Sequence, residues 1–323
     1  MALLLEKNAV KKLLITDVSP RDGLQNQTQY FSTQDKLWLI EALSACGVPR
    51  IEATSFVAPS AVPQMADAAD LLAAVSDSTK DKLCVLVPNQ KGLWRAQEAG
   101  AREVCVVLSA TETMNQRNIR MSLANALSTC LTVLAQAQEA GIRTRAYVAV
   151  AFACPFEGQT SPDVTLMLAK KMADAGADEV VIADTIGAAH PAQVSNLMRL
   201  LMADIGPSRL GLHLHDTRGL GLANAWAAMQ AGVQRFDSSV AGVGGCPFAP
   251  GAAGNLATED LAWLAHESGY ETGIDLPALL QVVEGLSIRL KRPLGGRSYA
   301  WLKQHFSQFP GATDPKVTSG FQS

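Results

Sequence analysis

The sequence lacks several features that would place it in a simple class. No apolar stretch approaches the roughly 18 residues that a membrane-spanning helix needs, and no basic segment precedes the short apolar run at the start, so we expect neither a membrane span nor a secretory signal. The 27 basic and 30 acidic residues leave a formal charge of −3, which gives no electrostatic reason to expect nucleic acid or an anionic membrane as a partner. The sequence therefore predicts a soluble, cytoplasmic protein that acts on a small molecule.

Cysteine and histidine are both scarce. None of the six cysteines stands in a CxxC pair, and most lie in apolar stretches, as reduced cysteines of cytosolic proteins commonly do. We therefore expect no thiolate metal cluster. Of only five histidines, two stand together in the stretch LGLHLHDTRG at 210–219.

What the chain does have is a regular alternation of short apolar runs with longer segments of helical period. Eight runs are typical of buried strands, and they cover 12–18, 50–56, 82–88, 103–109, 144–152, 179–185, 209–215 and 235–241. Helical segments such as 32–47 and 161–177 begin with a serine in the N-cap position, and a glycine follows several of the helices. Eight such units predict a closed (β/α)8 barrel, the TIM-barrel type of α/β fold.

A doubly wound open sheet is the structural alternative. No GxGxxG motif follows the first strand, and the count of eight strands fits a closed barrel better. Extra C-terminal helix is expected over 275–306, so that a single catalytic domain spans 1–306. Residues 307–323 are rich in proline, glycine and serine and predict a flexible C-terminal tail.

Polar side chains stand within or at the ends of several expected strands, and a barrel of this type carries its catalytic groups at the strand ends. His213 and His215 belong to the seventh strand, and because side chains alternate along a strand, both point to the same face. Facing inward, they would form one edge of a metal site. The other polar residues on these strands and their ends are Arg21, Asp22, Gln25, Glu52, Arg145 and Asp184.

A structural role is the alternative for each of these residues. A single buried histidine is more often a hydrogen-bonded core residue than a ligand, and charges at strand ends can form an ordinary ion network. Two histidines on one strand face, with several charges at the same rim, favour a metal site, because buried polar groups without a role are costly. Imidazoles with carboxylate and amide oxygens suit Mg²⁺ or Mn²⁺, and zinc is less expected.

The stretch AGVGGCPFAPGAAGN at 241–255 follows the eighth strand and is rich in glycine. Such a segment is mobile or sharply turned, which suits a lid over the mouth of the barrel. Cys246 lies within it, where a thiol can meet a substrate. A tight loop with an inert cysteine is the alternative.

The motifs PRDGLQN, IEATSF, CPFEG, ADTIG, HLHD and GGCPFAPGAAGN follow one another in an order that resembles the hydroxymethylglutaryl-CoA lyase family. The resemblance covers nearly all of 12–290. It implies cleavage of a small acyl-CoA, hydroxymethylglutaryl-CoA, to acetyl-CoA and acetoacetate by a retro-Claisen reaction. It also implies a divalent metal, Mg²⁺ or Mn²⁺, held by Asp22, His213, His215 and Asn255.

The same resemblance implies roles for further residues. Arg21 would bind the substrate and stabilise the enolate of the departing acetyl-CoA, and Cys246 would donate or carry a proton. The remaining site residues implied are the acidic Glu52 and Asp184, the metal or substrate neighbour Gln25, and the supporting, substrate-binding Arg145. A homo-oligomer, either a dimer or a tetramer, is expected.

Because of three departures from the family pattern, the sequence does not determine which acyl group the protein accepts. Arg218 stands where tyrosine is common, Ser60 where some members have lysine, and 108–119 differs from the usual form. Relatives cleave citramalyl-CoA or longer homologues, so a sister activity is the first alternative. A synthase that condenses an acyl-CoA with a 2-oxo acid is another, although such enzymes usually lack the loop cysteine and carry a long C-terminal regulatory domain. A catalytically inactive scaffold would have lost proposed ligands, and all four are present.

Overall fold

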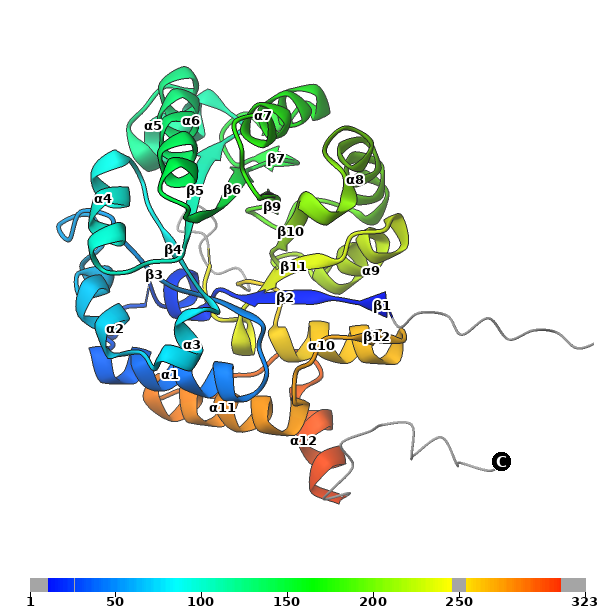
Figure 1. The fold of residues 1–323 in the computed structure, drawn as a ribbon. Helices are drawn as coiled ribbons and strands as arrows, with labels where there is room; N and C mark the ends of the chain where they lie inside the picture. Colours follow the sequence, from blue (N-terminus) through cyan, green and yellow to red (C-terminus); the bar gives the residue numbers. More distant parts are fainter. Residues whose placement is uncertain (1–10, 26, 246–253, 309–323) are drawn as a thin grey trace, which may run out of the picture.

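The computed structural model describes residues 11–25, 27–245 and 254–308. Eight parallel strands close into a barrel, which helices surround (Figure 1). Their order around the barrel is β10-β11-β2-β3-β4-β5-β6-β9. The bounds are β2 (Leu14–Asp17), β3 (Arg50–Ser55), β4 (Leu83–Leu86), β5 (Glu103–Ser109), β6 (Arg143–Ala149), β9 (Glu179–Asp184), β10 (Leu210–Leu214) and β11 (Arg235–Ser238). Each of the eight strands falls within or overlaps an expected run, and the TIM-barrel prediction is confirmed.

The helices follow the strands along the chain. They are α1 (Thr33–Ala45), α2 (Ala68–Ala74), α3 (Asp77–Lys80), α4 (Gln90–Glu98), α5 (Glu112–Ile119), α6 (Leu123–Glu139), α7 (Pro162–Asp174), α8 (Pro191–Ile205), α9 (Gly221–Ala231), α10 (Thr258–Glu267), α11 (Leu276–Arg289) and α12 (Tyr299–Gln308). The last two are the expected C-terminal helices, and α11 packs against α1 and α10. Among the helices of the described residues, none has both the length and the apolar character of a membrane span.

Local capping explains where several helices begin and end. The Ser32 hydroxyl accepts a hydrogen bond from the backbone N–H of Asp35 and caps α1, as its position in the sequence predicts. The glycines that end the helices before β3, β5, β6, β9 and β11 all have positive φ, where a side chain would be strained. They are Gly47, Gly100, Gly141, Gly176 and Gly232.

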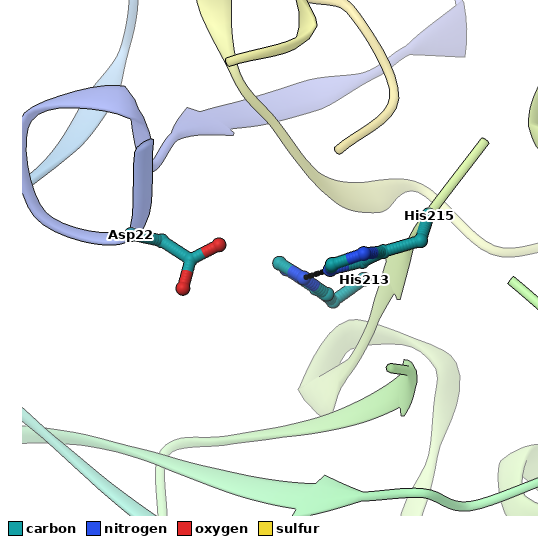
Figure 2. A group of neighbouring side chains, drawn as sticks. All are labelled: Asp22, His213 and His215. Carbon is teal, nitrogen blue, oxygen red and sulfur yellow. Dashed lines mark hydrogen bonds between the residues drawn. The ribbon is translucent and has the colours of Figure 1, made fainter. Parts of the chain in front are cut away.

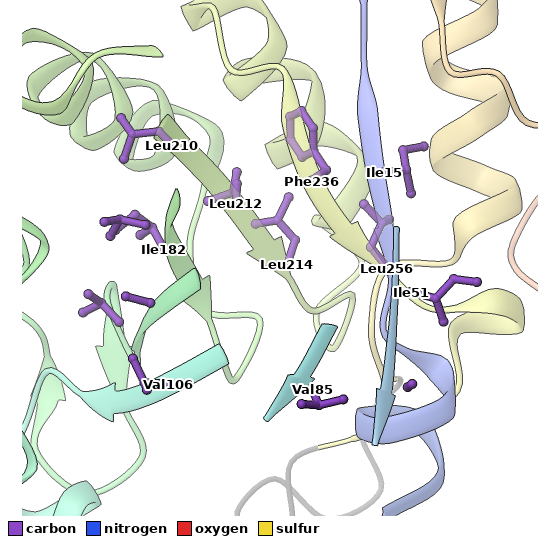
Figure 3. Packing of buried hydrophobic residues seen from close by; sticks show 14 of the residues in the cluster. Ile15, Ile51, Val85, Val106, Ile182, Leu210, Leu212, Leu214, Phe236 and Leu256 are labelled. Atoms are coloured by element: carbon purple, nitrogen blue, oxygen red, sulfur yellow. The ribbon is translucent and has the colours of Figure 1, made fainter. Parts of the chain in front are cut away.

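The main apolar core lies between the barrel and its helices, and Figure 3 shows part of it. Leu210, Leu212 and Leu214 of β10 belong to this core. Because side chains alternate along a strand, these leucines leave His213 to face the interior of the barrel. The interior itself holds a smaller apolar cluster, which includes Leu86 and Tyr147.

Several small elements were not expected from the sequence. Two-residue strands form the pairs β1 (Lys11–Lys12) with β12 (Tyr270–Glu271) and β7 (Ala153–Cys154) with β8 (Gly158–Gln159). A π-helical turn, η1, spans Ser19–Gly23, and three short 3-10 turns are η2 (Pro63–Met65), η3 (Pro207–Arg209) and η4 (Val240–Gly242). Of the expected tail 307–323, the first two residues complete α12 and the others lie outside the described residues.

Candidate active site and metal centre

Three side chains from two distant parts of the chain converge at the mouth of the barrel. One ligand atom from each of Asp22, His213 and His215 lies within 4.8 Å of the others, and the two imidazoles face Asp22 in Figure 2. The two Nε2 atoms are only 3.1 Å apart. These residues form a group that can hold a metal ion.

The strand and a tight turn place these ligands. His213 is the fourth residue of β10 and His215 follows its end, so that both side chains point inward. Asp22 lies in η1, and Asp17 at the end of β2 anchors that turn by accepting hydrogen bonds from the Ser19 backbone N–H and hydroxyl. Asp17 also accepts from the Thr258 hydroxyl, which ties the turn to the start of α10.

Asn255 completes the cluster. Its backbone forms a β-bridge with His215, and its Nδ2 donates to Asp22 Oδ2 at 2.8 Å and to the Val243 carbonyl at 3.1 Å. Its Oδ1 is buried and has no hydrogen-bond partner. A buried amide oxygen without a partner is unfavourable, and a cation beside it would satisfy it. Together with one carboxylate and two imidazoles, this oxygen fits a hard or borderline divalent ion.

The electrostatic environment favours the metal-binding protonation states of Asp22 and His215. Burial, followed by the neighbouring charge of His213, lowers the pKa of His215 to about 4, so its ring is neutral near pH 7. Burial alone would raise the pKa of Asp22, but Arg21 and the histidines outweigh it and lower the pKa. Burial would lower the pKa of His213, but hydrogen bonding to Asp237 prevails and raises it, which favours the protonated ring. A cation that binds His213 must displace this extra proton. A carboxylate and neutral imidazoles are the forms that bind metals.

Arg21 lies beside this cluster. Its Nη1 is 2.9 Å from Asp22 Oδ1 and its Nη2 is 2.6 Å from Glu52 Oε2. Glu52 is fully buried in β3, and burial raises the pKa of its carboxyl group, against the opposing effect of Arg21. Gln25 Nε2 donates to Asp22 Oδ1 at 3.0 Å. Arg21 is thus held by two acidic side chains next to the candidate metal ligands.

A cavity of about 150 Å³ opens above these residues. Arg21, Asp22, Gln25 and the two histidines form its polar wall. The remainder of the lining is mostly apolar or uncharged, namely Leu86, Val107, Met114, Asn118, Tyr147, Ala149, Ala183, Thr185 and Gly245. A polar end facing apolar walls suits a small acyl group that carries oxygen atoms at one end.

Asp184 and Arg145 lie away from the cavity wall. Asp184 turns away from the cavity and accepts hydrogen bonds from the backbone N–H groups of Ala188 and Ala189, so it shapes the turn after β9. Arg145 is the third residue of β6 and is buried within the barrel. Neither residue lines the cavity. The expectation that Arg145 binds substrate directly therefore lacks geometric support.

Two residues of the site were missed in the sequence. Tyr147 lines the cavity, and Asp237 contacts His213, with 3.3 Å between Oδ2 and Nδ1. Asp237 is a charge within an apolar strand, the same signal that drew attention to Glu52. Cys246, the expected catalytic thiol, lies outside the described residues.

Fold and site together define a TIM barrel with a candidate metal centre and a substrate cavity at its C-terminal mouth. The sequence model of the HMGL-like family matches residues 12–285, and the chain belongs to this family.

Three comparisons place the chain among its relatives. The hydroxymethylglutaryl-CoA lyase of Pseudomonas mevalonii is 42% identical over 288 residues, which cover 89% of this chain and 95% of the relative. The (R)-citramalyl-CoA lyase of Chloroflexus aurantiacus is 41% identical over 295 residues, which cover 88% of this chain and 93% of the relative. A structure of the Acinetobacter baumannii HMG-CoA lyase in complex with coenzyme A and 3-methylmalate superimposes with a TM-score of 0.85 at 38% identity, covering 93% of this chain and 96% of that one.

Proposed function

We propose that this protein cleaves 3-hydroxy-3-methylglutaryl-CoA to acetyl-CoA and acetoacetate, using Mg²⁺ or Mn²⁺. The observation that carries the proposal is the convergence of Asp22, His213, His215 and the unpartnered Oδ1 of Asn255 on a cavity beside Arg21. The relatives named hydroxymethylglutaryl-CoA lyase support the choice of substrate. The expected homo-oligomeric state and cytoplasmic location stay predictions.

The residues present suit each requirement of a retro-Claisen cleavage. Asp22, His213, His215 and Asn255 would hold the ion, which when bound lowers the pKa of the substrate's tertiary hydroxyl group. When a base accepts that proton, the carbon–carbon bond can break, so that one fragment becomes a ketone and the other a thioester enolate. The Arg21 guanidinium, held by Glu52 and Asp22, would stabilise the enolate charge.

The enolate carbon must then accept a proton to give acetyl-CoA. Cys246 is our candidate for the proton donor, because the glycine-rich segment that contains it connects Gly245 of the cavity wall to the ligand Asn255. The apolar wall formed by Leu86, Val107 and Met114 would limit the access of water to the enolate, which strengthens its interaction with Arg21.

Citramalyl-CoA is the second candidate substrate. Met114 and Asn118 line the cavity and lie in the segment 108–119, where the sequence departs from the usual family pattern. A relative named (R)-citramalyl-CoA lyase is 41% identical. One of the three departures from the family pattern thus lies in the cavity wall.

The deciding experiment compares acetyl-CoA release from hydroxymethylglutaryl-CoA and citramalyl-CoA in the presence of Mg²⁺ or Mn²⁺. We expect a clear preference for hydroxymethylglutaryl-CoA. The opposite preference would transfer the proposal to the sister activity. His215→Ala is the control variant, and it should lose both bound Mn²⁺ and turnover. Full activity and metal content in His215→Ala would refute the metal-dependent mechanism.

A further inference from the structure

Asp237 lies directly behind one of the candidate metal ligands and is not part of the cavity wall. We propose that Asp237 is a positioning residue, which holds the His213 ring in the tautomer and orientation that bind the metal. Because it concerns how the metal is bound, this inference rests on the proposed function. It assigns a role to Asp237 that does not involve contact with the substrate.

The strand register brings the two residues together. β10 and β11 are parallel neighbours, and His213 pairs with Asp237 across them. Their side chains therefore point to the same interior face of the barrel. His213 Nδ1 is 3.3 Å from Asp237 Oδ2, while Nε2 of the same ring is 3.1 Å from His215 Nε2. One ring nitrogen thus faces the carboxylate and the other faces the candidate metal site.

A neutral imidazole carries only one N–H, so the partner of one nitrogen determines the state of the other. A carboxylate can only accept a hydrogen bond, and it therefore keeps the proton of His213 on Nδ1. Nε2 is then left with a lone pair directed at the metal position. Carboxylate partners of metal-binding histidines commonly have this effect.

The carboxylate of Asp237 is itself rigidly held. Arg145 Nη2 donates to its Oδ1 at 2.8 Å, and the Tyr147 hydroxyl donates to its Oδ2 at 2.8 Å. Arg145 is fixed in turn by Glu179, through Nε at 3.2 Å and Nη2 at 2.8 Å. Asp237 is 1% exposed, so water does not compete for these contacts. Arg145 thus supports the metal site from within the barrel, through Asp237.

These contacts determine what Asp237→Asn would do. The Arg145 guanidinium has only donors, so the amide oxygen of the new side chain must occupy the Oδ1 position. The amide NH₂ group then occupies the Oδ2 position and donates to His213 Nδ1. The ring proton would move to Nε2, where it blocks the lone pair that the metal needs. The substitution conserves size and reverses the hydrogen bond.

The test measures Mn²⁺ affinity by titration of the metal-free full-length protein. We expect Asp237→Asn to weaken Mn²⁺ binding by about 10- to 100-fold, the usual effect of losing such a partner. Glu179→Gln is the matched control, because it removes another carboxylate from Arg145 while the Asp237–His213 contact stays in place. It should lower thermal stability but reduce the Mn²⁺ affinity much less than Asp237→Asn, because the glutamine oxygen can still accept a hydrogen bond from Arg145. Histidine-selective ¹⁵N NMR, with only five histidines to assign, should show the His213 proton on Nδ1 in the wild type and on Nε2 in Asp237→Asn.

Each alternative result has a definite meaning. Wild-type Mn²⁺ affinity in Asp237→Asn, or an equal loss in Glu179→Gln, would overturn the positioning role while leaving the proposed function intact. A wild-type protein that binds no Mn²⁺ would overturn both. If Asp237→Asn does not fold, Tyr147→Phe decides instead, because it removes a hydrogen bond that orients Oδ2. A smaller loss of Mn²⁺ affinity is expected there, and an unchanged affinity would refute the inference.

Discussion

Replacing Glu259 with glutamine should change how the stability of the protein depends on pH. Glu259 is fully buried in α10, where its carboxylate accepts hydrogen bonds from the backbone N–H groups of Ala241 at 3.0 Å and Gly296 at 2.6 Å. Burial raises its pKa from 4.5 to about 7, because the opposing effect of these hydrogen bonds is smaller. Between pH 4.5 and 7 the folded protein therefore binds more protons than the unfolded chain at this residue.

The sign and size of the effect follow from that difference. Because the folded state binds the extra proton, the contribution of Glu259 to stability is fully present below pH 4.5 and is lost as the pH rises through 7. At about 1.4 kcal/mol for each pKa unit, the loss amounts to roughly 3 kcal/mol. Glu259→Gln has no charge to bury, so its stability relative to the wild type should rise by up to this amount between pH 5 and 8.

Urea denaturation of both proteins at a series of pH values, with EDTA present, measures this change. Any loss of packing or of one backbone hydrogen bond in Glu259→Gln affects the difference equally at every pH. Only the charge produces a slope. The control is Glu267→Gln, at the end of the same helix, where the side chain is 53% exposed. A constant difference between Glu259→Gln and the wild type from pH 5 to 8 would refute the reasoning.

Two further substitutions test the glycine-rich segment that leads to Asn255. Cys246→Ser should reduce turnover severely and leave Mn²⁺ affinity unchanged, and normal turnover in an acetyl-CoA release assay would show that the thiol is not catalytic. Gly254→Ala should lower both the melting temperature and the Mn²⁺ affinity, because a Cβ atom there would collide with the Gly244 carbonyl oxygen. Gly245→Ala meets no atom within 4 Å and should melt like the wild type. Equal melting temperatures for the two alanine variants would contradict the steric argument.

The strands and the helix ends were predictable because their signals are local. Apolar runs and terminal glycines such as Gly47 and Gly176, both with positive φ, depend only on neighbouring residues. The pairs β1–β12 and β7–β8 contain two residues per strand, too few for any periodicity. The turn η1 was not predictable either, because the hydrogen bonds to Asp17 that shape it come partly from Thr258, far away in the sequence.

The sequence predicted which residues form the candidate site better than it predicted where their side chains lie. His213 and His215 face inward because of simple alternation, but alternation turns Asp184 away, while its neighbour Ala183 lines the cavity. Arg145 faces inward as well. It lies two and four residues before Tyr147 and Ala149, which do line the cavity, so it is too far down the strand. The sequence predicts the face of a side chain, but its height along the barrel depends on where the strand ends.

The candidate metal centre also links function to stability. Without an ion, the Asn255 Oδ1 is buried with no hydrogen-bond partner, and two imidazole nitrogens lie 3.1 Å apart. These nitrogens can share a hydrogen bond only if the neutral His215 ring carries its single N–H on Nε2, because Asp237 keeps the His213 proton on Nδ1. A divalent cation would satisfy the oxygen and both nitrogens at once. Any ligand that binds only the folded state stabilises it, by about 2.7 kcal/mol at a hundred times its dissociation constant. Asn255 Oδ1, one of the buried polar atoms without a partner in the described chain, is thus an atom that the proposed metal site requires.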